Sequence, residues 1–490
     1  MTASDEPADL NTETTAARAS AWSLGGRRFE FSGPMSAQLP IGAPVLLRSE
    51  HGTFLGQVIE KTDSGGAQRP RQVVGHGTLT ARVVDGRIEA ISPDDVFDDA
   101  TVEVAPPEVT KAWLAGDTAK SNSLPLGALR YPEGEHAHLL ASGFNRHTFL
   151  CGQSGSGKTY TLGLLLEQLL LRTSLRIVVF DPNSDYVHLD EIADASPEDL
   201  GGVTPPTRDQ ILVFRSHGDG PRLRARYGRL PHKQQGMVLG LDPLKDGDEF
   251  DLLMRIASDL GGPEYSLRQV RAALDPSAGD VERRLARRID NLGAADWSIW
   301  AEPGETPLAD QLTPHWRAAV LDLGELPSAE ERYVMAASIL SGLWARRLDR
   351  EPVLIVIDEA HNICPQNPAD ANQALAIEHT DRIAAEGRKY GLFLLVATQS
   401  PRKLHSNVLA QCENLLLMKT NSVADLDHLA DVFSHVPRGL VAQATGFQLG
   451  EGLAAGRIVP APQLFKSGLR ISPEGGADIP TTWARTGLPE

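Results

Sequence analysis

Eight consecutive residues match the phosphate-binding pattern G-x-x-x-x-G-K-[ST]: Gly152, Gln153, Ser154, Gly155, Ser156, Gly157, Lys158 and Thr159. Glycines allow successive backbone N–H groups to curl around the β- and γ-phosphates of a nucleotide. Lys158 adds a cation at the phosphates, the Thr159 hydroxyl can bind Mg²⁺, and we count the next residue, Tyr160, among the ATP-binding residues. An accidental glycine turn is the alternative, but the apolar run before the pattern and the helix-like run after it favour a nucleotide site.

Two adjacent carboxylates, Asp358 and Glu359, follow the five apolar residues 353–357. Such a run is typical of a buried parallel strand, and its carboxyl end would lie beside the phosphates. We expect Asp358 to hold Mg²⁺ through water. Glu359, pointing the other way, is expected to polarise the attacking water, a role that a hydrolase needs. A helix-capping acid after a core strand is the alternative.

A third apolar run, 392–397, ends in Thr398, Gln399 and Ser400. The polar end of this strand would reach the same edge of the sheet. Gln399 is therefore a candidate sensor of the γ-phosphate, able to bond the phosphate or the attacking water and to report hydrolysis to neighbouring segments. Ordinary turn chemistry at a strand end is the alternative.

The elements that must position these residues alternate between strand-like and helix-like segments, which predicts an α/β fold with a doubly wound, RecA-like P-loop core. Its expected strands are 148–151, 176–181, 211–214, 319–323, 353–358, 392–398 and 414–418. The 200 positions between Lys158 and Asp358 exceed what two or three βα units need. Residues of about 230–312 have helical spacing and are interpreted as a helical insertion.

Short alternating segments separated by glycine turns before this core predict a small N-terminal β-barrel. A hairpin is expected within 447–458. The predicted partition is a disordered tail at 1–21, the barrel at 22–106, a linker at 107–144, the ATPase core at 145–470 and a loose tail at 471–490.

Composition limits the possible partners. The 490 residues include 47 Lys and Arg against 64 Asp and Glu, a net charge of −17, so any DNA must meet local basic patches. The start of the chain lacks the cationic and apolar features of a signal peptide, and the longest apolar stretch, 162–171, is too short to span a membrane. We therefore expect a cytoplasmic protein without a membrane segment.

The three cysteines are far apart, which favours buried thiols over a metal site or disulfides.

Several motifs together resemble one family, the HerA branch of the HerA/FtsK ATPases. They are Asn145-Arg146-His147, Asp181-Pro182, Ile357-Asp358-Glu359-Ala360-His361, Glu386-Gly387-Arg388-Lys389-Tyr390-Gly391, Ala397-Thr398-Gln399 and Gly450-Glu451. The resemblance covers roughly residues 22–470. It implies a barrel followed by a RecA-like core with a helical insertion. It also implies a homohexameric ring that uses ATP to move along double-stranded DNA, commonly with a nuclease partner. Contacts of basic residues with the DNA phosphates would bind DNA without reading its sequence.

Ring assembly gives a reason for arginines outside the phosphate loop, because a neighbour's guanidinium can stabilise the transition state. Arg388 is the first candidate and Arg382, on the same expected helix, is its competitor. Arg146 is the third, at a position where the resemblance implies an arginine near the nucleotide. The family usually continues Thr-Gln with Arg-Pro, whereas here the basic residues are Arg402 and Lys403, which are candidates for lining a pore. Surface ion pairing or a solvated basic face is the alternative for each.

Three other functions are alternatives to this interpretation. The string Asp358-Glu359-Ala360-His361 also occurs in a two-lobed helicase superfamily, but the chain lacks the Ser-Ala-Thr motif and the second lobe of that group. A conjugation-type or protein-moving ring ATPase would have similar core motifs. A regulatory, non-motor ring that assembles an effector, for example in phage defence, is the third.

Overall fold

The computed structural model describes residues 19–25, 27–64, 72–92, 94–115, 123–302, 304–312 and 314–476. The chain forms two compact units, Met1–Gly116 and Asp117–Glu490. Each unit is described by itself.

The first unit is a closed β-barrel. Its strands pair in the order β2-β1-β7-β3-β4-β5, and β2 also pairs with β5, which closes the ring; β6 is added to β5 as a hairpin. The strands are β1 (Ala19–Ser23), β2 (Arg28–Pro34), β3 (Pro44–Ser49), β4 (Gly52–Ser64), β5 (Gln72–Val84), β6 (Arg87–Ala90) and β7 (Ala100–Val104), followed by helix α1 (Pro107–Ala115).

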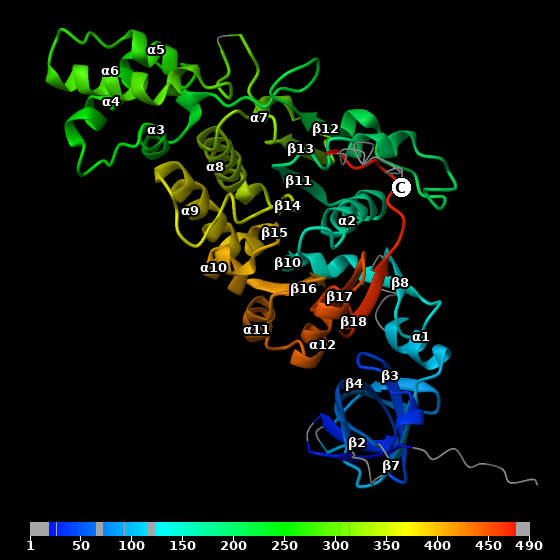
Figure 1. The fold of residues 1–490 in the computed structure, drawn as a ribbon. Coiled ribbons are helices and arrows are strands. Elements are labelled where there is room, and N and C mark those ends of the chain that lie inside the picture. The colour runs from blue at the N-terminus through cyan, green and yellow to red at the C-terminus, as the bar shows by residue number, and fades with distance from the viewer. Residues whose placement is uncertain are drawn as a thin grey trace, which may run out of the picture. The chain divides into compact units, whose positions relative to one another are not determined.

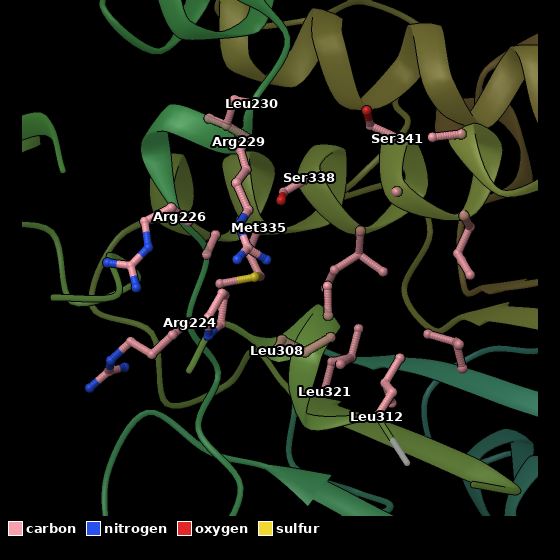
Figure 2. Close-up of a pocket in the computed structure, with 18 of the residues that line it drawn as sticks. Arg224, Arg226, Arg229, Leu230, Leu308, Leu312, Leu321, Met335, Ser338 and Ser341 are labelled. Atoms are coloured by element: carbon pink, nitrogen blue, oxygen red, sulfur yellow. The ribbon is translucent and has the colours of Figure 1, made fainter. Parts of the chain in front are cut away.

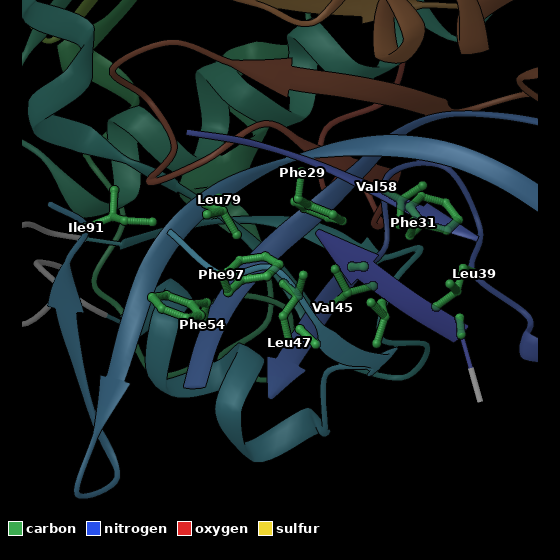
Figure 3. Packing of buried hydrophobic residues seen from close by; sticks show 14 residues of the cluster. Phe29, Phe31, Leu39, Val45, Leu47, Phe54, Val58, Leu79, Ile91 and Phe97 are labelled. Carbon is green, nitrogen blue, oxygen red and sulfur yellow. The ribbon is translucent and has the colours of Figure 1, made fainter. Parts of the chain in front are cut away.

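Alternating apolar residues of these strands fill the barrel. Phe29, Phe31 and Leu47 are fully buried, and the rings of Phe54 and Phe97 stack with their centroids 5.3 Å apart. Figure 3 shows these side chains pointing into a common interior. The barrel therefore has a hydrophobic core of its own.

The barrel begins earlier than we predicted. Residues 19–21 were assigned to a disordered tail, but they belong to β1, which pairs with β2 and β7. Ala19 and Ala21 are buried on the inner face. Their small side chains gave little hydrophobic signal, and so the strand was missed; residues 1–18 of the expected tail lie outside the described residues.

The second unit is built on an eleven-stranded sheet, ordered β12-β13-β11-β14-β15-β10-β16-β17-β18-β8-β9 (Figure 1). The first seven strands in this order are parallel, and the remaining four are antiparallel. The seven parallel strands are those predicted, apart from shifts of one or two residues at some ends: β10 (His147–Cys151), β11 (Arg176–Asp181), β12 (Ile211–Phe214), β13 (Ala318–Asp322), β14 (Val353–Ile357), β15 (Leu392–Thr398) and β16 (Cys412–Met418).

Helices cover both faces of this sheet. The connection through α2 (Lys158–Arg172) runs from β10 toward β11, whereas the connections through α8 (Ala329–Ala345) and α9 (Ala371–Glu386) run the opposite way along the sheet. Because parallel crossovers are right-handed, opposite directions put the helices on opposite faces. Figure 1 shows this arrangement, with α8 and α9 side by side.

A group of helices separates β12 from β13, in the region predicted as a helical insertion. Figure 1 shows α4, α5 and α6 packed together. The helices are α3 (His232–Val238), α4 (Gly247–Leu260), α5 (Leu267–Ala272), α6 (Asp280–Leu292) and α7 (Leu308–Gln311). Three helices follow β15 and β16: α10 (Ser406–Ala410), α11 (Val423–Val432) and α12 (Arg438–Ala442).

The boundaries of the core differ from our prediction at both ends. The expected linker contains β8 (Ser123–Leu129) and β9 (His136–Leu140), which extend the sheet. The expected hairpin is formed by β17 (Glu451–Ala455) and β18 (Gln463–Ser467), so it extends beyond residue 458. Residues 471–476, assigned to a loose tail, contact α2 and the loop after β11.

A buried histidine joins three elements of the core. The Nδ1 atom of His147 accepts a hydrogen bond from Leu394 N (2.8 Å), and Nε2 lies 3.0 Å from the carbonyl of Ala384. This arrangement requires the neutral ring with its proton on Nε2. Burial lowers the pKa of His147 to about 4, which agrees with a neutral ring.

Among the described residues, no helix has both the length and the apolar character needed to cross a membrane. The three cysteines, Cys151, Cys364 and Cys412, are free and buried, which confirms the prediction of buried thiols.

Candidate active site

The phosphate-binding pattern forms the loop between β10 and α2. Helix α2 begins at Lys158, so Lys158 and Thr159 occupy its first turn, where free N–H groups and the helix dipole favour an anion. Gly157 has φ +89°, a conformation that favours glycine, and a Cβ there would lie 3.1 Å from Gly450 N and press on the neighbouring turn. Gly450 N donates to Ser156 O at 3.0 Å. The turn before β17 therefore packs directly on the phosphate loop.

The two acids after β14 both contact the lysine of this loop. Lys158 Nζ lies 2.5 Å from Asp358 Oδ1 and 2.9 Å from Glu359 Oε1, and all three side chains are buried. We expected Glu359 to point away from Asp358, as it would in a regular strand, and this was wrong. Glu359 has a left-handed backbone (φ +43°), which turns the two consecutive carboxylates toward the same ammonium.

One oxygen of Glu359 is held by Lys158 and Gln399, and the other has no hydrogen-bond partner among the described residues. Gln399 Nε2 donates to Glu359 Oε1 at 2.8 Å, and His361 Nδ1 lies 3.3 Å from Glu359 Oε2. Burial alone would raise the pKa of Glu359, but the Lys158 ammonium and the hydrogen bonds from Gln399 and Lys158 lower it below its usual value. Glu359 is therefore an ionised, oriented acceptor for a proton.

Arg146 and Arg388 lie together at the opposite edge of the sheet. Arg388 Nη1 is 2.6 Å and Arg146 Nε is 3.2 Å from Glu413 Oε1. Arg146 precedes β10, Arg388 precedes β15, and Glu413 is near the start of β16, so all three mark the amino ends of parallel strands. The phosphate loop is at the carboxyl ends. Two guanidinium groups share one carboxylate, which leaves one unit of positive charge in this group of three residues.

The distance along β10 limits which ATP Arg146 can reach. The five residues of β10 separate Arg146 from Gly152, a span of roughly 17 Å. An arginine side chain cannot bridge that distance. Any contact of Arg146 with ATP must involve ATP bound by another copy of the chain.

Arg382 has a different environment. It pairs with Glu378 one turn earlier on α9 (3.0 Å), and its guanidinium lies 6.0 Å from the centre of the Trp344 ring on α8. These contacts are those of a surface residue that links two adjacent helices. Arg402 is also paired, with Asp425 at 2.6 Å.

The residues present fit ATP and Mg²⁺. Buried Ser156 Oγ lacks a hydrogen-bond partner among the described residues, which leaves it available within the phosphate loop. Thr159 and Asp358 offer a hydroxyl and a carboxylate oxygen, which are hard ligands of the kind Mg²⁺ prefers. Lys158 offers a cation for the phosphates.

A separate apolar pocket of about 230 Å³ lies beside α8 (Figure 2). Met335, Leu308 and Leu321 line it, and three arginines lie around one side. Two of these, Arg226 and Arg229, are engaged by the Ala301 carbonyl and by Glu264, respectively. Because the pocket includes no residue of the phosphate loop or of the acid pair, it contributes no group to the phosphate chemistry.

Three residues that contact the predicted site residues were not identified from the sequence. Tyr186 donates to Asp358 Oδ2 at 2.9 Å, His361 contacts Glu359, and Glu413 holds the two arginines. His361 is adjacent to the acid motif, which was a usable signal. Tyr186 and Glu413 reach their partners only through the tertiary fold, and local sequence offered no signal for them.

The parallel sheet, the phosphate loop at its carboxyl edge and the acid pair beside Lys158 together define a P-loop ATPase. The fold resembles a solved structure of VirB4 of Thermoanaerobacter pseudethanolicus, with a TM-score of 0.53 and 17% identity, covering 71% of this chain and 96% of that chain. This likeness confirms the predicted fold class.

The family follows from sequence relatives. Residues 126–245 match the family model described as "Helicase HerA, central domain". The chain is 30% identical over 392 residues to the DNA double-strand break repair helicase HerA of Sulfolobus acidocaldarius, covering 74% of each protein. It is 30% identical over 385 residues to the HerA of Pyrococcus furiosus, covering 66% of this chain and 65% of that protein. This chain belongs to the HerA family, as the motifs predicted.

The extent of the matches varies among relatives. The aligned part spans 24% of the probable helicase MJ1565 of Methanocaldococcus jannaschii and 65% of the HerA of Saccharolobus solfataricus, less than two thirds of each.

Proposed function

We propose that the chain hydrolyses ATP with Mg²⁺ as one subunit of a homohexameric ring that moves double-stranded DNA. Membership of the HerA family and the phosphate site support this proposal, and several relatives are named as DNA double-strand break repair helicases. The single observation that carries it is the division of the charged groups between two edges of one sheet. Lys158 and the acids are at one edge, and Arg146 and Arg388 are at the other.

The residues at the carboxyl edge support hydrolysis. Lys158 would bind the β- and γ-phosphates, while Thr159 and Asp358 would hold Mg²⁺, which shields phosphate charge when bound. Glu359, ionised and held by Gln399, would take the proton of the attacking water. Because Gln399 bonds Glu359 directly, a change in its contact with the γ-phosphate would alter the position of the base. This link supports the proposed sensor role.

The arginines at the amino edge support a ring. They lie too far from their own phosphate loop to act on it, and their surplus positive charge suits the phosphates of a neighbouring subunit. An arginine supplied in this way typically raises turnover by about 10³ or more. We propose Arg388, with Arg146, as the groups that act between subunits.

Mixing two inactive variants tests this division. Lys158→Ala removes the phosphate contact but keeps Arg388, whereas Arg388→Ala keeps the phosphate loop. Mixed rings should regain hydrolysis, because an intact loop can then face an intact arginine. Arg382→Ala is the matched control, since it removes a guanidinium from the same region and should be active without mixing. Absence of recovery in rings shown to contain both variants would contradict action between subunits.

We further propose that the DNA is bound without sequence preference through backbone phosphates. Arg402 and Lys403 are candidates, although Arg402 is already paired with Asp425. A nuclease or other effector partner is proposed from the family alone. Purification of the tagged ring from its native cells without an associated nuclease or effector would count against that partner.

A further inference from the structure

The segment after β18, residues 468–476, lies along α2 and reaches the loop after β11. We call this segment the C-terminal strap, and residues 181–187 the β11 loop. Neither the phosphate-binding pattern nor the acid pair includes any residue of the strap. Its contacts nevertheless lead to the centre of the ATP site.

The strap is attached to the phosphate-loop helix through a buried carboxylate. Glu167 on α2 accepts hydrogen bonds from Ile471 N (2.9 Å), Ser472 N (2.6 Å) and Ser472 Oγ (2.6 Å). Arg470 N donates to the hydroxyl of Tyr160, two residues after Lys158, at 2.8 Å. The strap therefore has a fixed position along α2.

The Arg470 side chain connects α2 to the β11 loop. Its guanidinium is almost fully buried, with Nε 3.8 Å from Glu167 Oε1. Nη2 donates to Asp185 O at 3.2 Å, and Cζ lies 5.7 Å from the centre of the Tyr186 ring. Gly475 N donates to the same Asp185 carbonyl at 3.1 Å. Because Arg470 also contacts Asp185 and Tyr186, neutralising the charge of Glu167 is not its sole role.

The β11 loop connects the contacts of Arg470 to Asp358, the acid that we assign to Mg²⁺. Asp181 at the end of β11 accepts from Asp185 N (2.9 Å) and Tyr186 N (2.8 Å), which fixes the turn of the loop. The Tyr186 hydroxyl donates to Asp358 Oδ2 at 2.9 Å, and Tyr186 is fully buried. Arg470 and Asp358 are thus joined through one tyrosine.

We propose that Arg470 is a positioning residue for the metal end of the ATP site, acting through Tyr186 on the Asp358 carboxylate. This inference rests on the proposed function of that site. A residue that orients a metal-binding carboxylate through a hydrogen bond typically changes metal affinity by about 10-fold or more. The strap is therefore part of the ATP site.

Metal affinity without turnover tests the proposal. Mn²⁺ binding in the presence of ADP can be followed by electron paramagnetic resonance for Tyr186→Phe, Arg470→Met and the double variant. We expect Tyr186→Phe to weaken Mn²⁺ binding by about 10-fold and Arg470→Met to weaken it by about 3-fold or more. Since both act on one hydrogen bond, the double variant should bind no more weakly than Tyr186→Phe. Effects that multiply in the double variant would overturn the proposal.

Two further variants separate positioning from folding. Arg226→Met removes another buried arginine, which donates to the Ala301 and Glu305 carbonyls among the residues between β12 and β13. It should lower stability without changing Mn²⁺ affinity. Arg470→Lys keeps the charge near Glu167 but loses the planar donor group, so it should weaken Mn²⁺ binding as Arg470→Met does. Wild-type affinity in Arg470→Lys would overturn the proposal, even if Arg470→Met fails to fold.

A failure of the Arg470 proposal can be told apart from a failure of the proposed function. A wild-type protein that binds Mn²⁺ and ADP but does not hydrolyse ATP would refute the proposed function, while the variants would still test Arg470. A wild-type protein that binds neither would overturn both.

Discussion

A methyl group added at Gly163, in the middle of α2, would occupy the place of the Arg470 guanidinium. The Cβ of Gly163→Ala would lie 2.4 Å from Arg470 Cζ and 2.6 Å from Nη1. Ordinary contact requires a separation about 1 Å greater. Gly342, inside α8, offers a matched control, because a Cβ there meets no atom within 4 Å.

The expected change is the sum of two opposed effects. Replacing glycine by alanine inside a helix ordinarily stabilises a protein by about 1 kcal/mol. Overpacking a closed site costs about 1–3 kcal/mol. Moving the guanidinium also weakens its hydrogen bonds to Ser472, Asp185 and Pro473, each worth about 1.5–3 kcal/mol for a charged donor. We expect Gly163→Ala to destabilise the core by about 2 kcal/mol.

Differential scanning calorimetry of both variants measures this difference. For a unit of this size, the melting temperature of the core should fall by about 3 °C in Gly163→Ala. It should stay level or rise slightly in Gly342→Ala. If Gly163→Ala melted at or above the temperature of Gly342→Ala, the close packing of Arg470 against α2 would be refuted.

Four further predictions follow from the site and the core. Lys158→Ala should weaken binding of a fluorescent ATP analogue by about 10-fold or more, and unchanged affinity would contradict the site assignment. Glu359→Gln should retain binding but lower hydrolysis by about 10²–10⁴, as measured by phosphate release. Arg388→Ala should lower kcat by about 10³ with little change in ATP affinity, whereas Arg382→Ala should keep most activity; equal losses would remove the distinction. Burial lowers the pKa of His147 from 6.5 to about 4. The neutral ring therefore contributes to stability above pH 6.5, and this contribution is lost as the pH falls toward 4. The loss is about 3 kcal/mol in total. His147→Gln should make the melting temperature depend less on pH, and an unchanged dependence would refute this role of His147.

The strands of the core could be predicted because each parallel strand is buried on both faces. Such strands are continuous apolar runs, as at 353–357, and polar residues mark their ends. The phosphate loop and the acids depend on the same local pattern. For this reason, their placement at one edge of the sheet followed directly from sequence.

Features set by tertiary contacts could not be predicted in this way. The left-handed conformation of Glu359 turns its side chain toward Lys158, and the residue type alone gives no indication of it. The strands β8 and β9 lie in the predicted linker, because β18, the strand through which β8 joins the sheet, is more than 300 positions away in sequence. Arg470 was not singled out, since Glu167 and Asp185 are brought to it only by the fold.

The reach of Arg146 also depends on the fold. The resemblance implied an arginine near a nucleotide at this position, as one of three candidates for action between subunits. The full length of β10 separates Arg146 from its own phosphate loop, so any contact of Arg146 with ATP is one between chains.

The measurement that tests the central claim most directly is steady-state ATP hydrolysis by the purified chain, with and without linear double-stranded DNA, with Glu359→Gln as the background. Strong stimulation by DNA that is lost in Glu359→Gln is the result expected of a DNA-moving ring. Hydrolysis that is indifferent to DNA would contradict the motor and favour a ring controlled by a partner protein.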